Sequence, residues 1–363
     1  MGMMEEAGDT RPELEPDGEL GPPWHYPMRG EVRVFSIASQ ELRGNALGDP
    51  TRRPLYVYLP PQYASDAERR FPTIYVLQGM TGQLDMWRNR AAFRLTPLEL
   101  YDQLFSDPEV PPAILVFVDC WTSLGGSQFL DSPGTGRYHT YLCNEVVPAV
   151  DRAFRTQADR DHRGLAGKSS GGYGAMVTPL LRPDLFSGLA SHAGDALFEY
   201  CYLPEFPETV RVLRDHYQGS FARFWADFRS RPGVGRPTDH TLIDSYCMAA
   251  CYSARPDGTP EMPFSEETGE MRPEVWERWL GWDPVRMVAR RAEAAAGLRA
   301  VYLDGGRSDE FHLEVGAVAF RAALERVGVG GVRLELFDGG HGGIEHRYPI
   351  GIRFLAEALS QEA

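Results

Sequence analysis

The sequence lacks the features that would place the protein in a membrane or on nucleic acid. It contains no run of 18 apolar residues, so no membrane-spanning helix is expected. Basic residues are outnumbered, with 37 Lys and Arg against 51 Asp and Glu and a formal net charge of −14. Phosphate binding requires a basic surface. The acidic start of the chain has neither the basic nor the apolar region of a signal peptide. We expect no membrane and no nucleic-acid partner.

Cysteine is also scarce, and its spacing indicates no metal site. The five cysteines are an odd number without metal-ligand spacing. Cys247 and Cys251 lie one helical turn apart, which is more typical of packing than of ligation. The cysteine content therefore predicts a reduced, cytoplasmic protein without a metal, and a hydrophobic content of 43% is typical of a globular one.

Short apolar runs that alternate with helical patterns predict an α/β fold with a mostly parallel central sheet and helices on both faces. Residues 73–77 and 113–118 are continuously apolar, as in strands buried on both faces. Alternating segments at 31–42 and 54–59 predict an antiparallel hairpin at a sheet edge. Further strands are expected at 164–166, 186–192, 299–303 and 332–337.

Two segments depart from this alternation. Residues 1–29 are rich in Pro, Gly and Glu without periodicity, which predicts a disordered or loosely docked tail. Residues 195–297 contain no central-strand pattern and many aromatic side chains, which we interpret as a helical cap inserted over the site. The alternative, that these aromatics form a small core of their own, is compatible with a cap. The core would then comprise residues 30–194 and 298–363.

The candidate nucleophile lies in the stretch RGLAGKSSGGYGA, residues 163–175. Within it, residues 167–171 match G-x-S-x-G, a sharp strand-to-helix turn that exposes a serine hydroxyl and surrounds it with small residues. We predict that Ser169 is the nucleophile, that the Ser170 N–H donates to an oxyanion, and that a helix begins at Ala175. A phosphate loop would need Gly at position 162, where His162 stands, and a Gly-rich turn without chemistry is the other alternative.

A second oxyanion donor is expected just past the strand at 73–77. The chain runs from that strand directly into residues 78–82, QGMTG. A Gly-containing loop at this place supplies a backbone N–H to the oxyanion in acyl-transfer hydrolases. We predict the Met80 N–H as this donor, with Gly79 allowing close approach. The alternative is an ordinary strand-to-helix loop.

A candidate base and a candidate acid follow the last two predicted strands, in the chain order Ser, acid, His. His341 lies between two pairs of glycines and would act as general base and then general acid. Three carboxylates follow the strand at 299–303. We favour Asp309 because it lies in the loop and not at the strand end, with Glu310 second and Asp304 third.

These motifs resemble the esterase D-like family of α/β-hydrolases, which includes S-formylglutathione hydrolases, mycolyltransferases, feruloyl esterases and siderophore esterases. The likeness is carried by residues 138–186, by TIYVLQGMTG, by GGRSDE and by GGHGG. It covers roughly residues 31–192 and 299–358. The resemblance implies an α/β-hydrolase fold, with Asp309 as the acid.

The family also suggests where substrate binds. The loop at 121–138 resembles a site-lining loop of the family, which implies substrate contacts by Trp121, Ser132 and Tyr138. Gln78 stands where the family usually has His, and Lys168 precedes the nucleophile where His or another residue is common. Both are added to the predicted substrate contacts.

Three functions are compatible with this sequence. The first is a serine hydrolase that cleaves a small-molecule ester or thioester through an acyl-enzyme, without metal or organic cofactor. The second passes the same acyl group to an alcohol or amine, as an acyltransferase. The third is a non-catalytic binding protein on the same scaffold. The sequence leaves the oligomeric state open, and a homo-oligomer is compatible with it.

Overall fold

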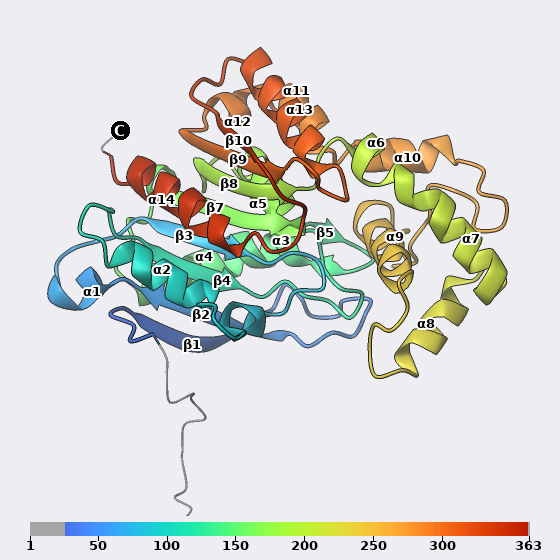
Figure 1. Cartoon of the computed structure of the whole chain (residues 1–363), viewed down its shortest axis with the longest axis horizontal. Helices are drawn as coiled ribbons and strands as arrows, with labels where there is room; N and C mark the ends of the chain where they lie inside the picture. Colours follow the sequence, from blue (N-terminus) through green and yellow to red (C-terminus); the bar gives the residue numbers. More distant parts are fainter. Residues whose placement is uncertain (1–25, 362–363) are drawn as a thin grey trace, which may run out of the picture.

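The central element is an eight-stranded sheet in the order β1-β2-β4-β3-β7-β8-β9-β10 (Figure 1). The computed structural model describes residues 26–361, so most of the predicted tail lies outside the described residues. The strands are β1 (Glu31–Ala38), β2 (Arg52–Leu59), β3 (Thr73–Leu77), β4 (Ile114–Val118), β7 (Arg163–Ser169), β8 (Gly188–Gly194), β9 (Ala300–Gly306) and β10 (Arg333–Phe337). Pairing is antiparallel for β1–β2 and β2–β4 and parallel for all the others. The predicted α/β class and edge hairpin are confirmed.

The sheet is covered on both faces, as its apolar strands require. In β3, Ile74 and Val76 join one core cluster, whereas Tyr75 and Leu77 join the other. This alternation is the period of two that strand geometry imposes. Helices α2 (Pro97–Phe105) and α14 (Tyr348–Leu359) pack together on one face. The other face carries α4 (Val147–Ala153), α5 (Ser170–Leu181) and α13 (Leu313–Arg326).

The helical segment that precedes β7 contains an irregular turn. Residues 138–153 are helical throughout, as α3 (Tyr138–Thr140), a π-helical turn (Tyr141–Val146) and α4. The π turn ends just before Pro148, which has no N–H to donate to the preceding turn.

The insertion forms a lobe of helices beside the carboxyl-terminal ends of the parallel strands (Figure 1). We call this the helical lobe. It consists of α6 (Phe198–Cys201), a 3₁₀ turn (Leu203–Glu205), α7 (Phe206–Tyr217), α8 (Phe221–Arg229), α9 (Asp239–Tyr252) and α10 (Pro273–Leu280). The next helices, α11 (Pro284–Arg290) and α12 (Ala292–Ala296), pack on α5. They therefore belong to the helical layer of the core, although the predicted cap extended to residue 297.

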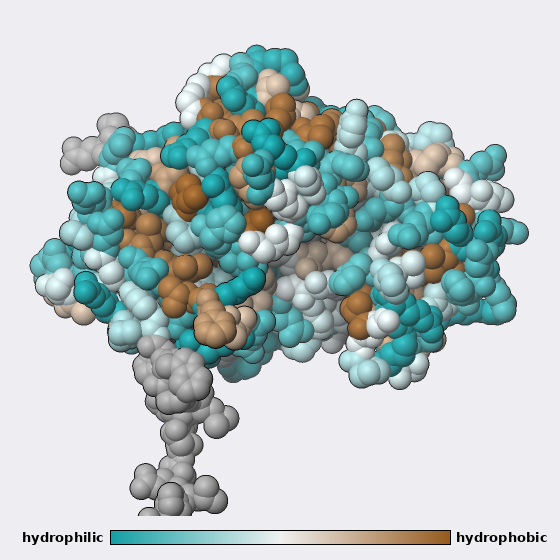
Figure 2. Space-filling view, viewed as in Figure 1, coloured by the Kyte–Doolittle hydropathy of each residue, from teal (hydrophilic) through white to brown (hydrophobic). Residues whose placement is uncertain are grey.

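Most aromatic side chains of the insertion form a core inside the lobe. The Phe206 ring lies 4.8 Å from Phe264, 5.8 Å from Trp276 and 5.7 Å from Trp279, centroid to centroid. A second group gathers around Trp225, 5.6 Å from Phe228. The outer surface of the lobe is largely hydrophilic in Figure 2. Within residues 26–361, no helix combines the length and the apolar character needed to cross a bilayer.

Candidate active site

The turn from β7 into α5 forces Ser169 into a strained backbone conformation. Its φ of 57° and ψ of −127° lie outside the regions that L-residues normally adopt. The turn tolerates only small neighbours: a Cβ on Gly167 would lie 2.5 Å from the Gly171 backbone, and one on Gly171 would lie 2.2 Å from the Leu77 carbonyl oxygen. Helix α5 begins at Ser170 and not at Ala175 as predicted, so the glycines lie within its first turns.

The predicted oxyanion loop passes close to the candidate nucleophile. A Cβ on Gly79 would lie 3.5 Å from the Cβ of Ser169. The loop is held by a hydrogen bond of 2.8 Å from the Thr81 N–H to the Gly125 carbonyl. Among the described residues, the Met80 N–H finds no hydrogen-bond acceptor. The Ser170 N–H has no acceptor within its helix because Ser170 is the first helical residue. Two donors are therefore available near Ser169.

The two loops that follow β9 and β10 bring a carboxylate to a histidine. His341 Nδ1 lies 2.9 Å from Asp309 Oδ2, and the other Asp309 oxygen accepts the Phe311 N–H at 2.9 Å. Glu310 accepts the backbone N–H of His341 at 2.8 Å. Asp304 has other partners. Its carboxylate lies 3.0 Å from His192 Nδ1. Of the three predicted acids, Asp309 is the one that contacts the His341 imidazole.

Adjacent parallel strands explain why these loops meet. Backbone hydrogen bonds join them, from the Arg307 N–H to the Phe337 carbonyl at 2.8 Å and from the Ser308 N–H to the Gly339 carbonyl at 3.0 Å. Gly306 makes this approach possible, because a Cβ there would lie 2.4 Å from the Gly339 oxygen. The Asp309–His341 pair is thus fixed by backbone contacts and does not depend on flexible side chains alone.

Ser169 and His341 open into one cavity of about 490 Å³ between the sheet and the helical lobe. Ser169 Oγ makes no hydrogen bond to any residue from 26 to 361, a common state for a catalytic hydroxyl without substrate. The core contributes Gly79, Met80, Lys168, Ser170, Asp195 and Phe311 to the wall, among others, and the lobe contributes Tyr202, Glu205, Pro237, His240, Thr241 and Asp244.

Of the predicted substrate contacts, Lys168 lines this cavity and Gln78 does not. Burial lowers the pKa of Lys168, while Glu345, Asp309 and Glu310 act in the opposite direction. Gln78 is buried, and its amide donates to the Gly82 carbonyl at 3.0 Å. The Gln78 side chain therefore braces the loop at residues 78–82 and does not present its amide to the cavity.

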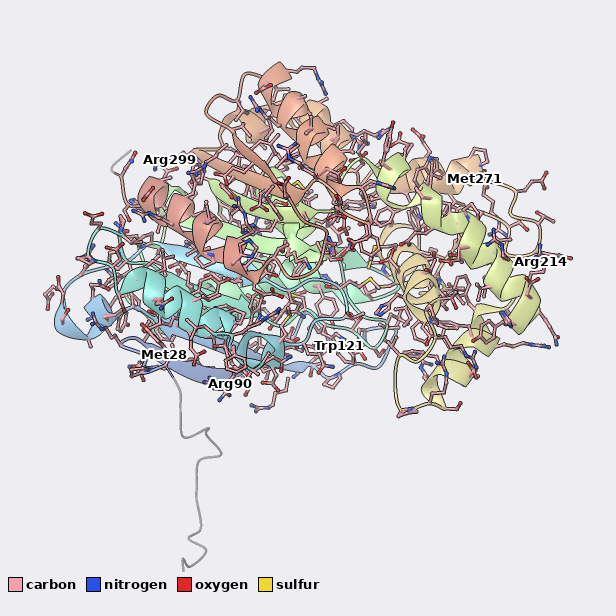
Figure 3. All side chains as sticks on the ribbon, in the orientation of Figure 1. Met28, Arg90, Trp121, Arg214, Met271 and Arg299 are labelled. Carbon is pink, nitrogen blue, oxygen red and sulfur yellow. The ribbon has the colours of Figure 1, made fainter. Side chains whose placement is uncertain are left out.

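Trp121, Ser132 and Tyr138 lie outside the cavity wall as well. Ser132 donates its hydroxyl to the Ala250 carbonyl at the end of α9. Tyr138 is fully buried and donates to the Trp121 carbonyl at 3.3 Å. Figure 3 shows Trp121 between the sheet and the lobe. The 121–138 loop thus supports the lobe instead of offering these side chains to a substrate.

Four carboxyl groups in the cavity wall were not expected from the sequence, those of Asp195, Glu205, Asp244 and Glu345. Burial and the charge of Asp244 raise the pKa of Glu205 to about 10. Burial and the charge of Asp195 raise the pKa of Asp244 to about 7, although its contact with Glu205 acts in the opposite direction. Asp195 directly follows β8, and a carboxylate at a strand end is a signal that could have been used. Glu205 and Asp244 reach the cavity only through the packing of the lobe.

Comparison with known proteins assigns this chain to a family. A family model described as putative esterase matches residues 45–341. The chain belongs to this family. It is 26% identical over 152 residues to an endo-1,4-beta-xylanase/feruloyl esterase of Xylanibacter ruminicola, a match that covers 41% of this chain and 20% of that protein. The chain spans between 20% and 57% of the length of the curated relatives it matches.

Solved structures show the same fold at low sequence identity. A ferulic acid esterase superposes with a TM-score of 0.57 and 19% identity, covering 91% of this chain and 99% of that one. An S-formylglutathione hydrolase from Agrobacterium tumefaciens gives a TM-score of 0.55 and 17% identity, covering 93% and 98%. The α/β-hydrolase fold and the esterase D-like family expected from the sequence are therefore confirmed.

Proposed function

We propose that the protein is a serine hydrolase that cleaves a small-molecule carboxylic ester or thioester through an acyl-enzyme. The observation that carries this proposal is the strained Ser169, which shares one cavity with the Asp309–His341 pair. Membership of the putative esterase family supports ester chemistry. Relatives named as feruloyl esterase and S-formylglutathione hydrolase support an ester or a thioester as the bond cleaved.

Each residue has a definite task in this reaction. His341 takes the proton of the Ser169 hydroxyl as its oxygen attacks the acyl carbon, and then gives that proton to the leaving group. Asp309 holds the imidazole orientation and stabilises its protonated form. The N–H groups of Met80 and Ser170 receive the negative charge that develops on the acyl oxygen. Water, activated by His341, then releases the acid and restores Ser169.

A fluorophosphonate tests this proposal with the intact chain. The reagent phosphonylates a serine only when a base activates it, so one adduct per chain is expected by intact-mass measurement. Ser169→Ala should remove the adduct, whereas Ser360→Ala at the exposed end of α14 should retain it. A folded wild-type protein without an adduct, or an adduct that persists in Ser169→Ala, would overturn the proposal.

The proposed setting is a reducing compartment, as the cysteine content predicts. All five cysteines are unpaired and buried. Burial raises the pKa of Cys120, Cys201 and Cys251, which keeps these thiols protonated and unreactive. None of them is needed in the proposed reaction.

A further inference from the structure

Asp195 leaves one carboxylate oxygen without a partner in the wall of the cavity that holds Ser169. The residue is only 6% exposed. Its Oδ2 accepts hydrogen bonds from Gln128 Nε2 and Tyr202 OH, both at 3.0 Å, and from Ser170 Oγ at 3.4 Å. Its Oδ1 accepts none from the described residues. When a buried carboxylate turns an oxygen without a donor toward a cavity, a hydrogen-bond donor or a cation of a ligand would be stabilised there.

Glu205 and Asp244 extend this acidic surface along the lobe side of the cavity. Neither forms an ion pair with a basic residue in the described part of the chain. Burial raises the pKa of all three carboxyl groups, and the charge of Asp195 adds to the shifts of Glu205 and Asp244. The contact between Glu205 and Asp244 raises the pKa of Glu205 above that of Asp244. Glu205 therefore holds its proton more tightly than Asp244, and Asp244 is the first of the two to ionise. We call Asp195, Glu205 and Asp244 the acidic wall.

Among the described residues, no arginine or lysine is placed to neutralise the acidic wall, and the imidazoles that line the same cavity are those of His240 and His341. No described arginine lines the cavity. Lys168, the sole lysine of the sequence, does line it, but the charges that act on its ammonium are those of Glu345, Asp309 and Glu310. The His341 imidazole faces Asp195 and is the group proposed to carry a proton only during the reaction.

The geometry favours an organic cation over a metal ion. Within residues 26–361, no three His, Cys, Asp or Glu side chains are arranged so that they could hold a metal. The cavity volume of about 490 Å³ is that of a site for a small organic molecule. Tyr202, which lines the cavity between core and lobe, adds an aromatic ring of the kind that attracts alkylammonium groups.

We propose that the acidic wall binds an alkylammonium group of the substrate, so that the protein prefers cationic esters or thioesters over neutral ones of the same shape. This inference rests on the proposed function, because the cation is carried by the ester that Ser169 attacks. The same wall repels substrates with a carboxylate in that position. In this proposal the charge of the acidic wall selects the substrate, and the residues at the ends of the sheet strands perform the reaction.

Two matched pairs of substrates test the inference, one with the charge on the leaving group and one with the charge on the acyl group. Acetylthiocholine is compared with S-(3,3-dimethylbutyl) thioacetate, and 4-nitrophenyl 4-(trimethylammonio)butanoate with 4-nitrophenyl 5,5-dimethylhexanoate. Each pair differs by one quaternary nitrogen in place of a carbon. We expect kcat/KM to be about tenfold or more higher for the cationic member of at least one pair, the size of one or two partly buried ionic contacts.

Variants assign the preference to the acidic wall. Glu205→Gln combined with Asp244→Asn should reduce the preference to about threefold or less, and the ratio within a pair cancels any general loss of activity. Asp215→Asn is the matched control, because Asp215 is exposed on α7 next to Arg214, which Figure 3 shows on the outer side of the lobe. This variant should retain the full preference.

Binding to Ser169→Ala separates the inference from the proposed reaction. Calorimetry uses the pair that shows the preference in kcat/KM, either the two thioacetates or the two 4-nitrophenyl esters. The cationic member of that pair should bind more tightly than the neutral one. Equal kcat/KM and equal binding within both pairs, in a protein that forms the Ser169 adduct, would overturn the inference and leave the hydrolase intact. Binding of the cation by a protein that forms no adduct and cleaves no ester would instead overturn the proposed function.

Discussion

The sheet side and the lobe side of the cavity are built by different means. On the sheet side, Met80, Ser169 and His341 lie at or just past the carboxyl ends of the parallel strands β3, β7 and β10, and backbone hydrogen bonds hold the loops that carry Met80 and His341. On the lobe side, Glu205 and Asp244 extend from helices that pack through their own aromatic core. Backbone geometry holds the proposed reacting groups to the tolerance that catalysis needs. Side chains on a separately packed lobe set the charge that a substrate meets.

The largest effect should come from removing the nucleophile of the sheet side. Ser169→Ala is expected to lower kcat for ester hydrolysis by roughly four orders of magnitude or more, since it removes the hydroxyl that forms the proposed acyl-enzyme. Thermal unfolding should change little. Hydrolysis of either 4-nitrophenyl ester, followed by release of nitrophenol, measures the loss. A variant that keeps a tenth of the activity would place the reaction elsewhere.

The acid should be separable from its neighbour on the same loop. Asp309→Asn is expected to lower kcat by about three orders of magnitude, because the amide favours the wrong imidazole tautomer. Glu310→Gln is the matched comparison, since the Glu310 carboxylate accepts the His341 backbone N–H and makes no hydrogen bond to the imidazole. It should cost less than about tenfold, because glutamine keeps an acceptor oxygen for this N–H and only the charge is lost. Similar losses in the two variants would contradict the assignment of Asp309.

The tight turn of the sheet side should tolerate no added methyl group. Gly171→Ala would bring a Cβ to 2.2 Å from the Leu77 carbonyl oxygen, so we expect the free energy of unfolding to fall by about 3 kcal/mol. Urea denaturation measures this. Gly330→Ala is the control, because a Cβ there meets no atom within 4 Å. It should change stability by less than about 0.5 kcal/mol. Equal effects would mean that the turn can relax to accept a side chain.

On the lobe side, the titration of Asp244 should make the stability of the protein depend on pH. The pKa of Asp244 is raised to about 7 in the folded protein, whereas an aspartate in an unfolded chain titrates near 3.8. The folded state therefore keeps a proton that the unfolded chain releases, and this stabilisation is lost as the pH rises from about 4 through 7. We expect Asp244→Asn to raise Tm relative to wild type by about 1–3 °C more at pH 8 than at pH 5. A pH-independent difference would mean that Asp244 titrates normally.

Local patterns in the sequence were enough to find the sheet and the candidate reacting groups. All five residues of the apolar run at 73–77 are buried, as their composition predicts. A short strand without polar residues on either side can lie only where both faces of the sheet are covered. The G-x-S-x-G stretch likewise carries its own steric rule, since only small residues fit a turn as tight as the one at Ser169. Chain order placed the acid and the histidine on neighbouring loops.

Tertiary packing decided what no local pattern contains. Asp304 and Asp309 are equally acidic in sequence, but Asp304 pairs with His192 from β8, whereas Asp309 meets His341. The acidic wall joins residues 195, 205 and 244, which are distant in the chain and reach one cavity through the packing of the lobe. Ser132 was expected at the substrate but lies under α9. Strand and turn rules act over a few residues, whereas these contacts depend on how whole elements pack.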